Sequence, residues 1–319
     1  MIDSTPLPPS VKADRRALPA DILSEISALN GAQPIAFTTT LLGAWLVIGC
    51  AVGGAMYLHS WWATAAAILI VATRQNVLGL LVHEQSHLLG YRGKYGDLIV
   101  NLFAAYPLLV LTVEDYAQVH LAHHRDYFSP DDPDYVRKSG EEWSFPKSRR
   151  ALFRLFLTDL VGLNLVKLVH GKRSSRKNLA FARRYAIPVW VRPAYFLVIA
   201  ALLTYVGGWT AFLLYWLLPL LTIMQLLVRW GAICEHKYNL PGASVAVSTP
   251  LILLSMWERL LLPNLNFAMH PYHHYFPGIA FTRLPRVHEI YCREGLVDHA
   301  NTFHGYRAYL KSLVLNQNA

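Results

Sequence analysis

Long apolar stretches alternate with polar segments along this 319-residue chain, and four of them form two pairs. The first pair covers Ile35–Leu58 and Trp61–Leu81, and the second covers Trp190–Val206 and Trp209–Val228. A helix needs about 20 predominantly apolar residues to cross a bilayer, and each stretch approaches that length. The turn inside each pair is short, so the pattern predicts two transmembrane hairpins. We therefore expect an all-α integral membrane protein with four transmembrane helices.

Lysine and arginine residues are concentrated between the two hairpins. The turns at Met56–Trp62 and Val206–Thr210 contain neither residue type, whereas the segment Glu114–Trp190 contains many. Cytoplasmic loops of membrane proteins are enriched in these cations, so both turns are predicted outside and the rest in the cytoplasm. The leader before Ile35 is polar and does not resemble a cleavable signal peptide. We expect a cytoplasmic tail over residues 1–34 and one membrane-bound domain over residues 35–319, in a bacterial inner membrane.

Two shorter apolar stretches lie outside the hairpins. Leu98–Val113 has 16 residues, which is short for a transmembrane helix. If it crossed the bilayer, the histidine-rich segments on its two sides would be on opposite faces of the membrane. We interpret it as a re-entrant or interfacial helix. Leu251–Leu262 contains Glu258 and Arg259, so we place this segment at the membrane interface too. These segments would form part of a cytoplasmic helical cap.

The composition supports a membrane protein and excludes several other classes. Apolar residues make up 54% of the chain, and the mean hydropathy is +0.29. The net charge is +9, and the basic residues lie in loops beside the apolar stretches. They do not alternate with aromatic residues as in nucleic-acid-binding proteins, so nucleic-acid binding is disfavoured. The three cysteines form no C-x-x-C pair, so no rubredoxin, zinc ribbon or iron–sulfur domain is fused to the chain. They also do not suggest a disulfide framework.

Nine of the fourteen histidines follow a spacing that favours metal binding. Residues at i, i+3 and i+4 share one face of a helix, so each histidine motif presents its imidazoles to a common point. Neutral imidazole is a ligand for iron, zinc, copper and nickel. One ion takes about four to six ligands, so nine converging histidines indicate two metals. The predicted ligands are His83, His87, His120, His123, His124, His236, His270, His273 and His274.

Alternative interpretations explain fewer of these residues. His83-Glu84-Gln85-Ser86-His87 also fits the H-E-x-x-H zinc protease motif, but that interpretation leaves seven positioned histidines without a role. His236 is a single histidine, and it could instead be an ordinary interfacial residue. The histidines that show no such spacing, and to which we assign no metal, are His59, His170, His288, His299 and His304. Carboxylates near the motifs could accept hydrogen bonds from ligand imidazoles; they are Glu84, Asp97, Glu114, Asp115, Asp126, Asp131, Asp132, Asp134 and Glu235.

Polar residues interrupt two of the predicted transmembrane helices. Asn76 is seven residues from His83 and therefore shares its helix face, and Gln225 and Arg229 lie on the face that leads to His236. Polar groups at bilayer depth tend to face a cavity. We expect Asn76, Gln225 and either Arg74 or Arg229 to bind a polar group of the substrate or to end its tunnel. Alternatively, the two arginines extend to the lipid headgroups.

The order of the motifs resembles the integral-membrane fatty acid desaturase and hydroxylase superfamily. The similarity rests on H-x-x-x-H, H-x-x-H-H, a single histidine and H-x-x-H-H between two hairpins, over roughly Ile35 to Arg307. Asp131-Asp132-Pro133-Asp134, Phe276-Pro277-Gly278 and Arg283-Leu284-Pro285 are similar to bacterial members. The resemblance implies a di-iron centre, dioxygen and two electrons per turnover. No His-Pro-Gly-Gly of a fused cytochrome b5 occurs, so a separate donor of the ferredoxin, rubredoxin or cytochrome b5 type, with its reductase, is expected.

The favoured function is therefore the desaturation of an acyl chain or similar lipid taken from the bilayer. Related members of that superfamily suggest two alternatives: hydroxylation of a carotenoid, alkane or lipid, and decarboxylation of a fatty acid to a terminal alkene. The non-enzyme alternative is a metal transporter. Transporters hold their ligands near the bilayer midplane, whereas these motifs flank the apolar stretches on one side, which disfavours transport.

Overall fold

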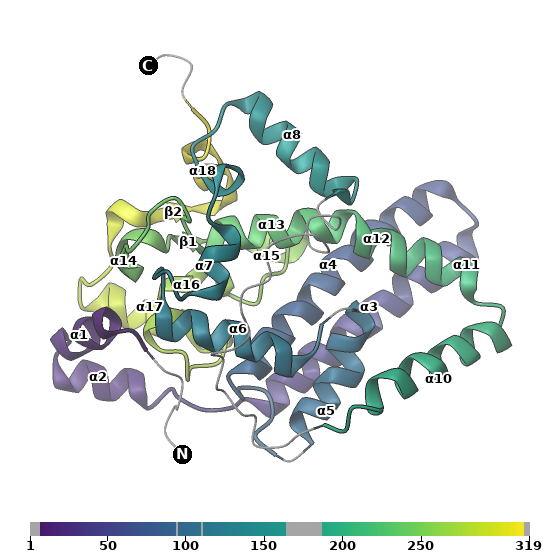
Figure 1. Cartoon of the computed structure of the whole chain (residues 1–319), viewed down its shortest axis with the longest axis horizontal. Helices are drawn as coiled ribbons and strands as arrows, with labels where there is room; N and C mark the ends of the chain where they lie inside the picture. The colour runs from purple at the N-terminus through teal and green to yellow at the C-terminus, as the bar shows by residue number, and fades with distance from the viewer. Residues whose placement is uncertain (1–6, 94, 110, 164–186, 316–319) are drawn as a thin grey trace.

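The computed structural model describes residues 7–93, 95–109, 111–163 and 187–315. His170 and much of the basic segment between the hairpins lie outside the described residues. The described chain is mostly helical, with one small sheet. Apolar helices occupy one side of the molecule, and shorter helices form a cap on the other (Figure 1).

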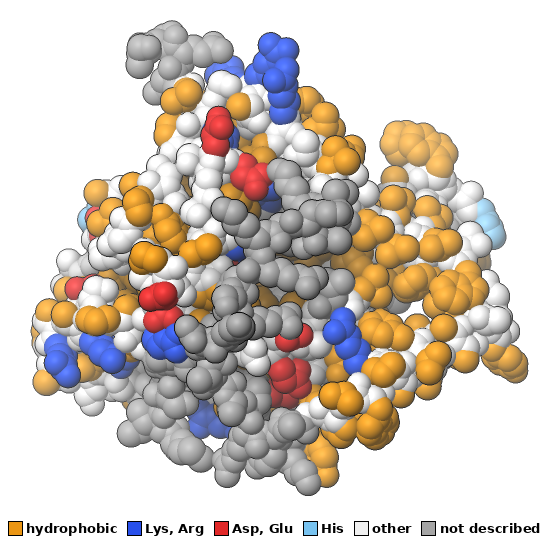
Figure 2. All heavy atoms as spheres, in the orientation of Figure 1, with side chains coloured by type: hydrophobic (Ala, Val, Ile, Leu, Met, Phe, Trp, Pro, Cys, Tyr) orange, Lys and Arg blue, Asp and Glu red, His pale blue; other side chains and the backbone are white. Residues whose placement is uncertain are grey.

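The first predicted hairpin is present. Helix α3 covers Pro34–Leu58 and α4 covers Trp61–Ser86, and the two pack against each other along their length. His59 makes the turn between them in the left-handed conformation, with φ of 46°. Both helices are long and apolar enough to cross a membrane. Leu46 keeps 68% of its surface exposed on α3, as expected for a side chain that faces lipid. Hydrophobic side chains cover this side of the molecule almost continuously (Figure 2).

The second predicted hairpin is less regular than the sequence suggested. Its second arm is a broken helix over Trp209–Glu235 that is long enough to cross a membrane. The parts of this helix are α11 (Trp209–Phe212), η5 (Leu213–Leu217), α12 (Leu218–Leu221) and α13 (Ile223–Glu235). Its first arm, α10, covers only Val191–Tyr205, which is 15 residues. At about 1.5 Å per residue this gives roughly 22 Å, less than the roughly 30 Å of the hydrocarbon core. The helix predicted over 190–206 is thus present with nearly those bounds, but it is shorter than the helices that could cross a membrane.

The apolar stretch 98–113 is not one helix. It forms α5 (Gly96–Val100), η1 (Asn101–Ala105) and η2 (Tyr106–Leu108), and the chain then bends by 91° into α6 (Val113–Asp126). Asn101 holds the bend, because its Oδ1 accepts from the Val113 backbone N–H and its Nδ2 donates to Glu114, both at 2.9 Å. Such a bent pair is either a broken span or a re-entrant segment, so three helices, or four with this pair, could cross a membrane.

The cap contains the remaining elements. They are α7 (Pro133–Lys138), η3 (Glu141–Trp143), α8 (Arg149–Leu160), α14 (Val245–Ser248), α15 (Met256–Leu261), η6 (Phe267–Met269), α16 (His270–Tyr275), α17 (Leu284–Arg293), η7 (His299–Asn301) and α18 (Gly305–Ser312). Strands β1 (Leu251–Leu253) and β2 (Thr302–His304) pair in parallel, with Leu251 opposite Thr302. The stretch 251–262 is therefore a strand followed by a short helix, because β2 provides backbone partners that an interfacial helix would not need.

The N-terminal segment is packed onto the cap. Helix α1 covers Pro9–Ala17 and α2 covers Ala20–Ser27, and they contact α16 and α17 respectively. Ile22 and Ile26 are buried in one hydrophobic cluster with Leu284 and Val287. These contacts enclose α16 from the side remote from the apolar helices (Figure 1). Helices α1 and α2 thus extend the cap on the side of α16, one of the helices that carry the histidines.

Candidate metal centre

Four helix ends bring the nine predicted histidines together. The last turn of α4 carries His83, and His87 caps that helix. Helix α6 carries His120, His123 and His124, and α16 carries His270, His273 and His274. His236 follows α13 directly as its cap, with an extended backbone. Within each helix the spacing places these side chains on one face, so the four elements present their imidazoles to a common interior volume.

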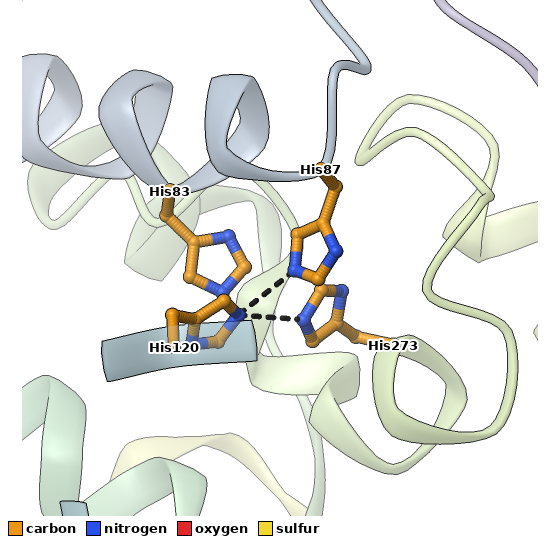
Figure 3. Close-up of side chains that lie close together, drawn as sticks. All are labelled: His83, His87, His120 and His273. Carbon is orange, nitrogen blue, oxygen red and sulfur yellow. Dashed lines mark hydrogen bonds between the residues drawn. The ribbon is translucent and has the colours of Figure 1, made fainter. Parts of the chain in front are cut away.

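Five histidines form a first cluster. His120 Nε2 lies 2.8 Å from His87 Nε2 and 3.4 Å from His273 Nε2 (Figure 3). His83 joins them, since the nearest ring nitrogens of these four residues all lie within 4.8 Å of one another. His124 completes the group, with its Nε2 3.1 Å from His120 Nε2 and 3.0 Å from His273 Nε2.

Four histidines form a second cluster around His236. Its Nε2 lies 3.2 Å from His123 Nε2, 3.1 Å from His270 Nε2 and 3.2 Å from His274 Nε2. The two clusters are adjacent, because the His124 and His274 rings stack with 4.4 Å between their centroids. All nine predicted ligands are thus close together, in a group of five beside a group of four.

The donor geometry of both clusters suits a transition metal. Imidazole nitrogens bind such ions at about 2.0–2.1 Å, which separates two ligand nitrogens by roughly 3.0–3.4 Å at angles between 90° and 109°. The Nε2 atoms that face one another here are separated by 2.8–3.4 Å. His236 Nε2 faces three other Nε2 atoms at once. A neutral imidazole nitrogen has either one proton or one lone pair, so hydrogen bonds alone cannot satisfy this arrangement. A cation at the centre of each cluster would satisfy it.

Burial keeps the three imidazoles of α16 in the form that binds metals. His124 and His273 have no exposed surface, and His123 has 2%. Burial, and after it the neighbouring imidazoles, hold the pKa values of His273 and His274 well below the usual value. The same causes lower the pKa of His270. These histidines are therefore neutral at pH 7, and each has a lone pair available for a metal.

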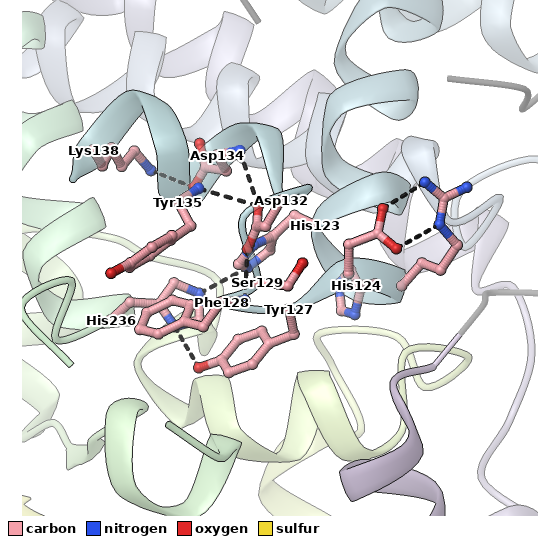
Figure 4. Close-up of polar contacts among 12 residues, drawn as sticks. His123, His124, Tyr127, Phe128, Ser129, Asp132, Asp134, Tyr135, Lys138 and His236 are labelled. Carbon is pink, nitrogen blue, oxygen red and sulfur yellow. Dashed lines mark hydrogen bonds and ion pairs between the residues drawn. The ribbon is translucent and has the colours of Figure 1, made fainter. Parts of the chain in front are cut away.

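Asp132 orients one of these ligands. Its carboxylate has no exposed surface, and its Oδ2 accepts from His123 Nδ1 at 2.7 Å and from the Phe128 backbone N–H at 2.9 Å (Figure 4). Its Oδ1 accepts from the backbone N–H groups of Asp134 and Tyr135 at the start of α7. Because the proton on His123 is held at Nδ1, the Nε2 lone pair faces the second cluster. Asp132 is one of the nearby carboxylates that we expected to play this role.

A buried hydroxyl cluster that the sequence did not predict holds His236. Tyr127 Oη lies 3.2 Å from His236 Nδ1, 2.6 Å from Ser248 Oγ and 2.7 Å from Thr249 Oγ1. Thr249 Oγ1 also lies 3.1 Å from His236 Nδ1. Tyr127 follows His123 by four residues, so the helical spacing of α6 could have indicated it. Ser248 and Thr249 reach the site only through tertiary packing, and their sequence context contains no such signal.

Three other nearby carboxylates have partners away from the imidazoles. Glu84 Oε1 accepts from the Phe281 backbone N–H at 3.2 Å, which ties α4 to the segment after α16. Glu114 accepts from Asn101 in the bend, and Asp134 pairs with Arg137 and Lys138 on α7. These two cations hold the pKa of Asp134 well below its usual value, although burial opposes them. Since Glu84 is engaged in this way, the zinc protease interpretation of its motif has no support.

The four predicted substrate residues are not brought together. Asn76 Nδ2 donates to the Pro263 backbone carbonyl at 3.4 Å, and Gln225 Nε2 donates to the Leu220 carbonyl on its own helix at 2.8 Å. Arg74 Nε donates to Thr73. Arg229 forms a buried ion pair with Asp159 of α8, and its guanidinium stacks 4.5 Å from the Trp143 ring. Gln225 and Arg229 thus have partners other than the imidazoles, and their expected role toward a substrate stays a prediction.

Asn76 does line a narrow crevice beside the first cluster. The crevice has a volume of about 40 Å³ and lies between α4, α13 and the loop Leu262–Asn264. Phe267 also lines it, and the Phe267 ring packs edge-on against the His83 ring with 4.3 Å between centroids. Arg74, Gln225 and Arg229 are not among its lining residues.

The histidines to which we assigned no metal lie outside both clusters wherever the structure describes them. His59 forms the turn between α3 and α4, and His288 on α17 contacts Tyr272 at 2.9 Å. His299 and His304 belong to η7 and β2. His170 is outside the described residues. The spacing of the motifs thus separated the clustered histidines from these four.

Apolar helices that end in two adjacent histidine clusters define a class of membrane-bound oxidoreductases that act on lipids. The model of one family, described as fatty acid desaturase, matches residues 59–307, which is more than half of the chain. The chain belongs to the fatty acid desaturase family. It is also similar to the sphingolipid delta(4)-desaturase of Schizosaccharomyces pombe, with 26% identity over 292 residues that cover 86% of this chain and 75% of that protein. It is therefore a fatty acid desaturase-like oxidoreductase, as the motifs indicated.

Proposed function

We propose that this chain is a di-iron, dioxygen-dependent desaturase of membrane lipids. The observation that supports this proposal is the division of nine histidines, eight of them buried, into adjacent groups of five and four, with Nε2 separations that suit metal ligands. One iron would be held by His83, His87, His120, His124 and His273. The other would be held by His123, His236, His270 and His274. Nitrogen-only sites of this kind suit iron among several metals, and the family membership favours iron.

The protein's own residues prepare the centre for an oxidation of an unactivated C–H bond. When bound, two irons would supply the oxidising power for this reaction. Dioxygen, two electrons, two protons and two hydrogens taken from adjacent substrate carbons give two waters and a carbon–carbon double bond. Asp132 keeps the His123 proton at Nδ1, and Tyr127 and Thr249 fix the His236 ring. Tyr116 and Phe267 pack against His120 and His83, which excludes water from the first cluster.

The substrate would be the acyl or alkyl chain of a lipid that reaches the centre from the bilayer. The relative in Schizosaccharomyces pombe is named for a sphingolipid substrate, which favours a complex lipid over a soluble molecule. The active site would lie at the cytoplasmic face, because the predicted charge asymmetry places the cap there. A separate donor of the ferredoxin, rubredoxin or cytochrome b5 type, with its reductase, would supply the electrons. The basic segment between the hairpins would dock an acidic carrier of this kind.

The test is to express the chain in a host and analyse its lipids and hydrocarbons by mass spectrometry, with the His120→Ala variant as control. We expect a lipid with two hydrogens fewer, which is absent with the control. A product with one additional oxygen would instead indicate a hydroxylase, and a shortened terminal alkene would indicate a decarboxylase. Elemental analysis of the purified protein should find about two irons per chain, and bound zinc without any lipid product would contradict the proposal.

A further inference from the structure

Helix α8 presents an exposed apolar stripe, formed by Phe153, Leu157 and Leu160. These residues follow the spacing i, i+4 and i+7, so they share one face of the helix. All three side chains are exposed, and Phe153 keeps 66% of its surface. Single exposed apolar residues are common on proteins, whereas a contiguous group of large ones usually marks an interaction surface. The stripe therefore needs a partner that covers it.

Another face of α8 fixes this helix to the membrane helix α13. Asp159 forms a buried ion pair with Arg229 of α13, and it lies about 120° around α8 from Phe153. Phe156 packs edge-on against Trp230 of α13, with 6.2 Å between the ring centroids. The stripe is thus held in a defined position beside α13 and is turned away from it.

Three arginines accompany the stripe. Arg149 and Arg150 belong to the first turn of α8, and Arg154 follows one turn later. Their side chains are exposed and form no hydrogen bond or ion pair with the residues that the structure describes. The first turn contains no acidic residue, although the dipole of a helix favours anions at this end. The beginning of α8 is therefore suited to bind anionic groups.

Helix α15 continues the apolar surface beside the same end of α13. Its large apolar side chains are each more than 60% exposed: Met256, Trp257, Leu260 and Leu261. The residue after α15, Leu262, lines the narrow crevice together with Trp230 of α13. Val228 of α13 is exposed as well. In Figure 2, basic side chains lie over the start of α8, and hydrophobic side chains follow along the rest of it toward the apolar helices.

We infer that α8 and α15 lie in the headgroup region of the bilayer, and that Arg149, Arg150 and Arg154 bind the phosphates of anionic phospholipids. Helices in this region combine an apolar face with basic residues. The aliphatic part of an arginine side chain can lie along the apolar boundary while its guanidinium binds phosphate. An acidic electron carrier, which we proposed for the basic segment as a whole, would contact the arginines and leave the stripe in water. A leaflet with anionic lipids covers both.

The experiment places a bimane label on Leu157→Cys in the full chain without Cys50 and Cys292, since the remaining Cys234 is buried. The protein is reconstituted in nanodiscs of phosphatidylcholine alone or mixed with phosphatidylglycerol. Both kinds of disc contain a lipid brominated in the upper part of its acyl chains, which quenches bimane on contact. We expect quenching to be about twofold stronger with phosphatidylglycerol, because anionic lipids attract each arginine at the surface. A label on Ala13→Cys, exposed on α1, should stay unquenched in both.

Two charge variants test the role of the arginines. Arg149→Gln together with Arg150→Gln should reduce the quenching to its value in neutral discs. Lys12→Gln together with Arg16→Gln removes the same charge from exposed positions of α1 and should keep the parent value.

Thermal unfolding is measured on every variant, so that a folding defect is recognised. Equal quenching in the two lipid mixtures would overturn the inference. So would an unquenched label on α8 that only an added acidic ferredoxin protects from a water-soluble quencher, because the partner would then be a protein. The measurement needs no turnover, so either result would leave the di-iron proposal intact.

Discussion

Asp132 and His123 are joined by a hydrogen bond of 2.7 Å between Oδ2 and Nδ1, and neither residue has more than 2% of its surface exposed. The pair fixes which nitrogen of His123 faces the second cluster. Removing a partner of this kind typically lowers metal affinity or activity by roughly 10- to 100-fold. Asp132→Asn should therefore lower the metal content of the second cluster and reduce turnover by about that factor.

The neighbouring residue provides the control for this prediction. Asp131 is exposed, and its side chain makes no hydrogen bond or ion pair with the residues that the structure describes. Asp131→Asn should keep the full metal content and the full rate, measured by elemental analysis and by product formation. Equal losses in the two variants would indicate that the charge of the loop, rather than the bond to His123, is important.

The division of the histidines predicts which of them are essential. Replacing His120 or His273 by alanine removes a nitrogen from the first cluster, and kcat should fall by about 100-fold or more rather than KM changing alone. His288→Ala and His304→Ala should retain the parent rate, because these side chains lie outside both clusters. Steady-state kinetics on the four variants provides the measurement. A fully active His273→Ala would refute the ligand assignment.

Arg229 is predicted to stabilise the fold and not to select the substrate. Its guanidinium is paired with Asp159, and both side chains are buried. Removing one partner of a buried pair costs about 3–5 kcal/mol because the other charge is left uncompensated. Arg229→Met should lower the thermal unfolding temperature in detergent, and a second change, Asp159→Leu, should recover much of the loss. The product profile should stay that of the parent chain, and a changed chain length would contradict this assignment.

Tyr127 is predicted to hold His236 through its hydroxyl group. Tyr127→Phe keeps the ring, which stacks on Phe128, but removes the contacts to His236, Ser248 and Thr249. The loss of such a bond typically costs about 1 kcal/mol. We expect a small decrease in stability together with a lower rate, because the His236 ring then has one contact less. Unfolding curves and kcat measured on the same preparation test this, and a variant with unchanged stability and rate would contradict it.

The sidedness of the membrane domain can be measured directly. Tyr57, at the tip of the first hairpin, is 83% exposed, and Ser139, at the end of α7, is exposed in the cap. Cysteines placed at these positions, in a chain without Cys50 and Cys292, should react with an impermeant maleimide from opposite sides. We expect Tyr57→Cys to react in intact cells and Ser139→Cys only in inverted vesicles. Reaction of both from the same side would overturn the predicted topology.

The amino-acid sequence by itself determined the family, the first hairpin and the set of clustered histidines. Each of these depends on short-range regularity: apolar runs of bilayer length, and imidazoles at i, i+3 and i+4 that share a helix face whatever the helix packs against. The absence of such spacing also separated His288 and His304 from the site. The motif order then identified the family before any geometry was considered.

Only the tertiary structure decided which histidines share a cluster and which polar groups support them. His124 faces the first cluster and His123 the second, although they are adjacent in sequence, because their side chains differ by about 100° around α6. Of the carboxylates near the motifs, Asp132 reaches a ligand because α7 begins beside it. Arg229, on the face expected to carry substrate, pairs instead with Asp159, 70 residues away. Periodicity fixes the face of a helix, but the partner of that face depends on long-range packing that no local pattern contains.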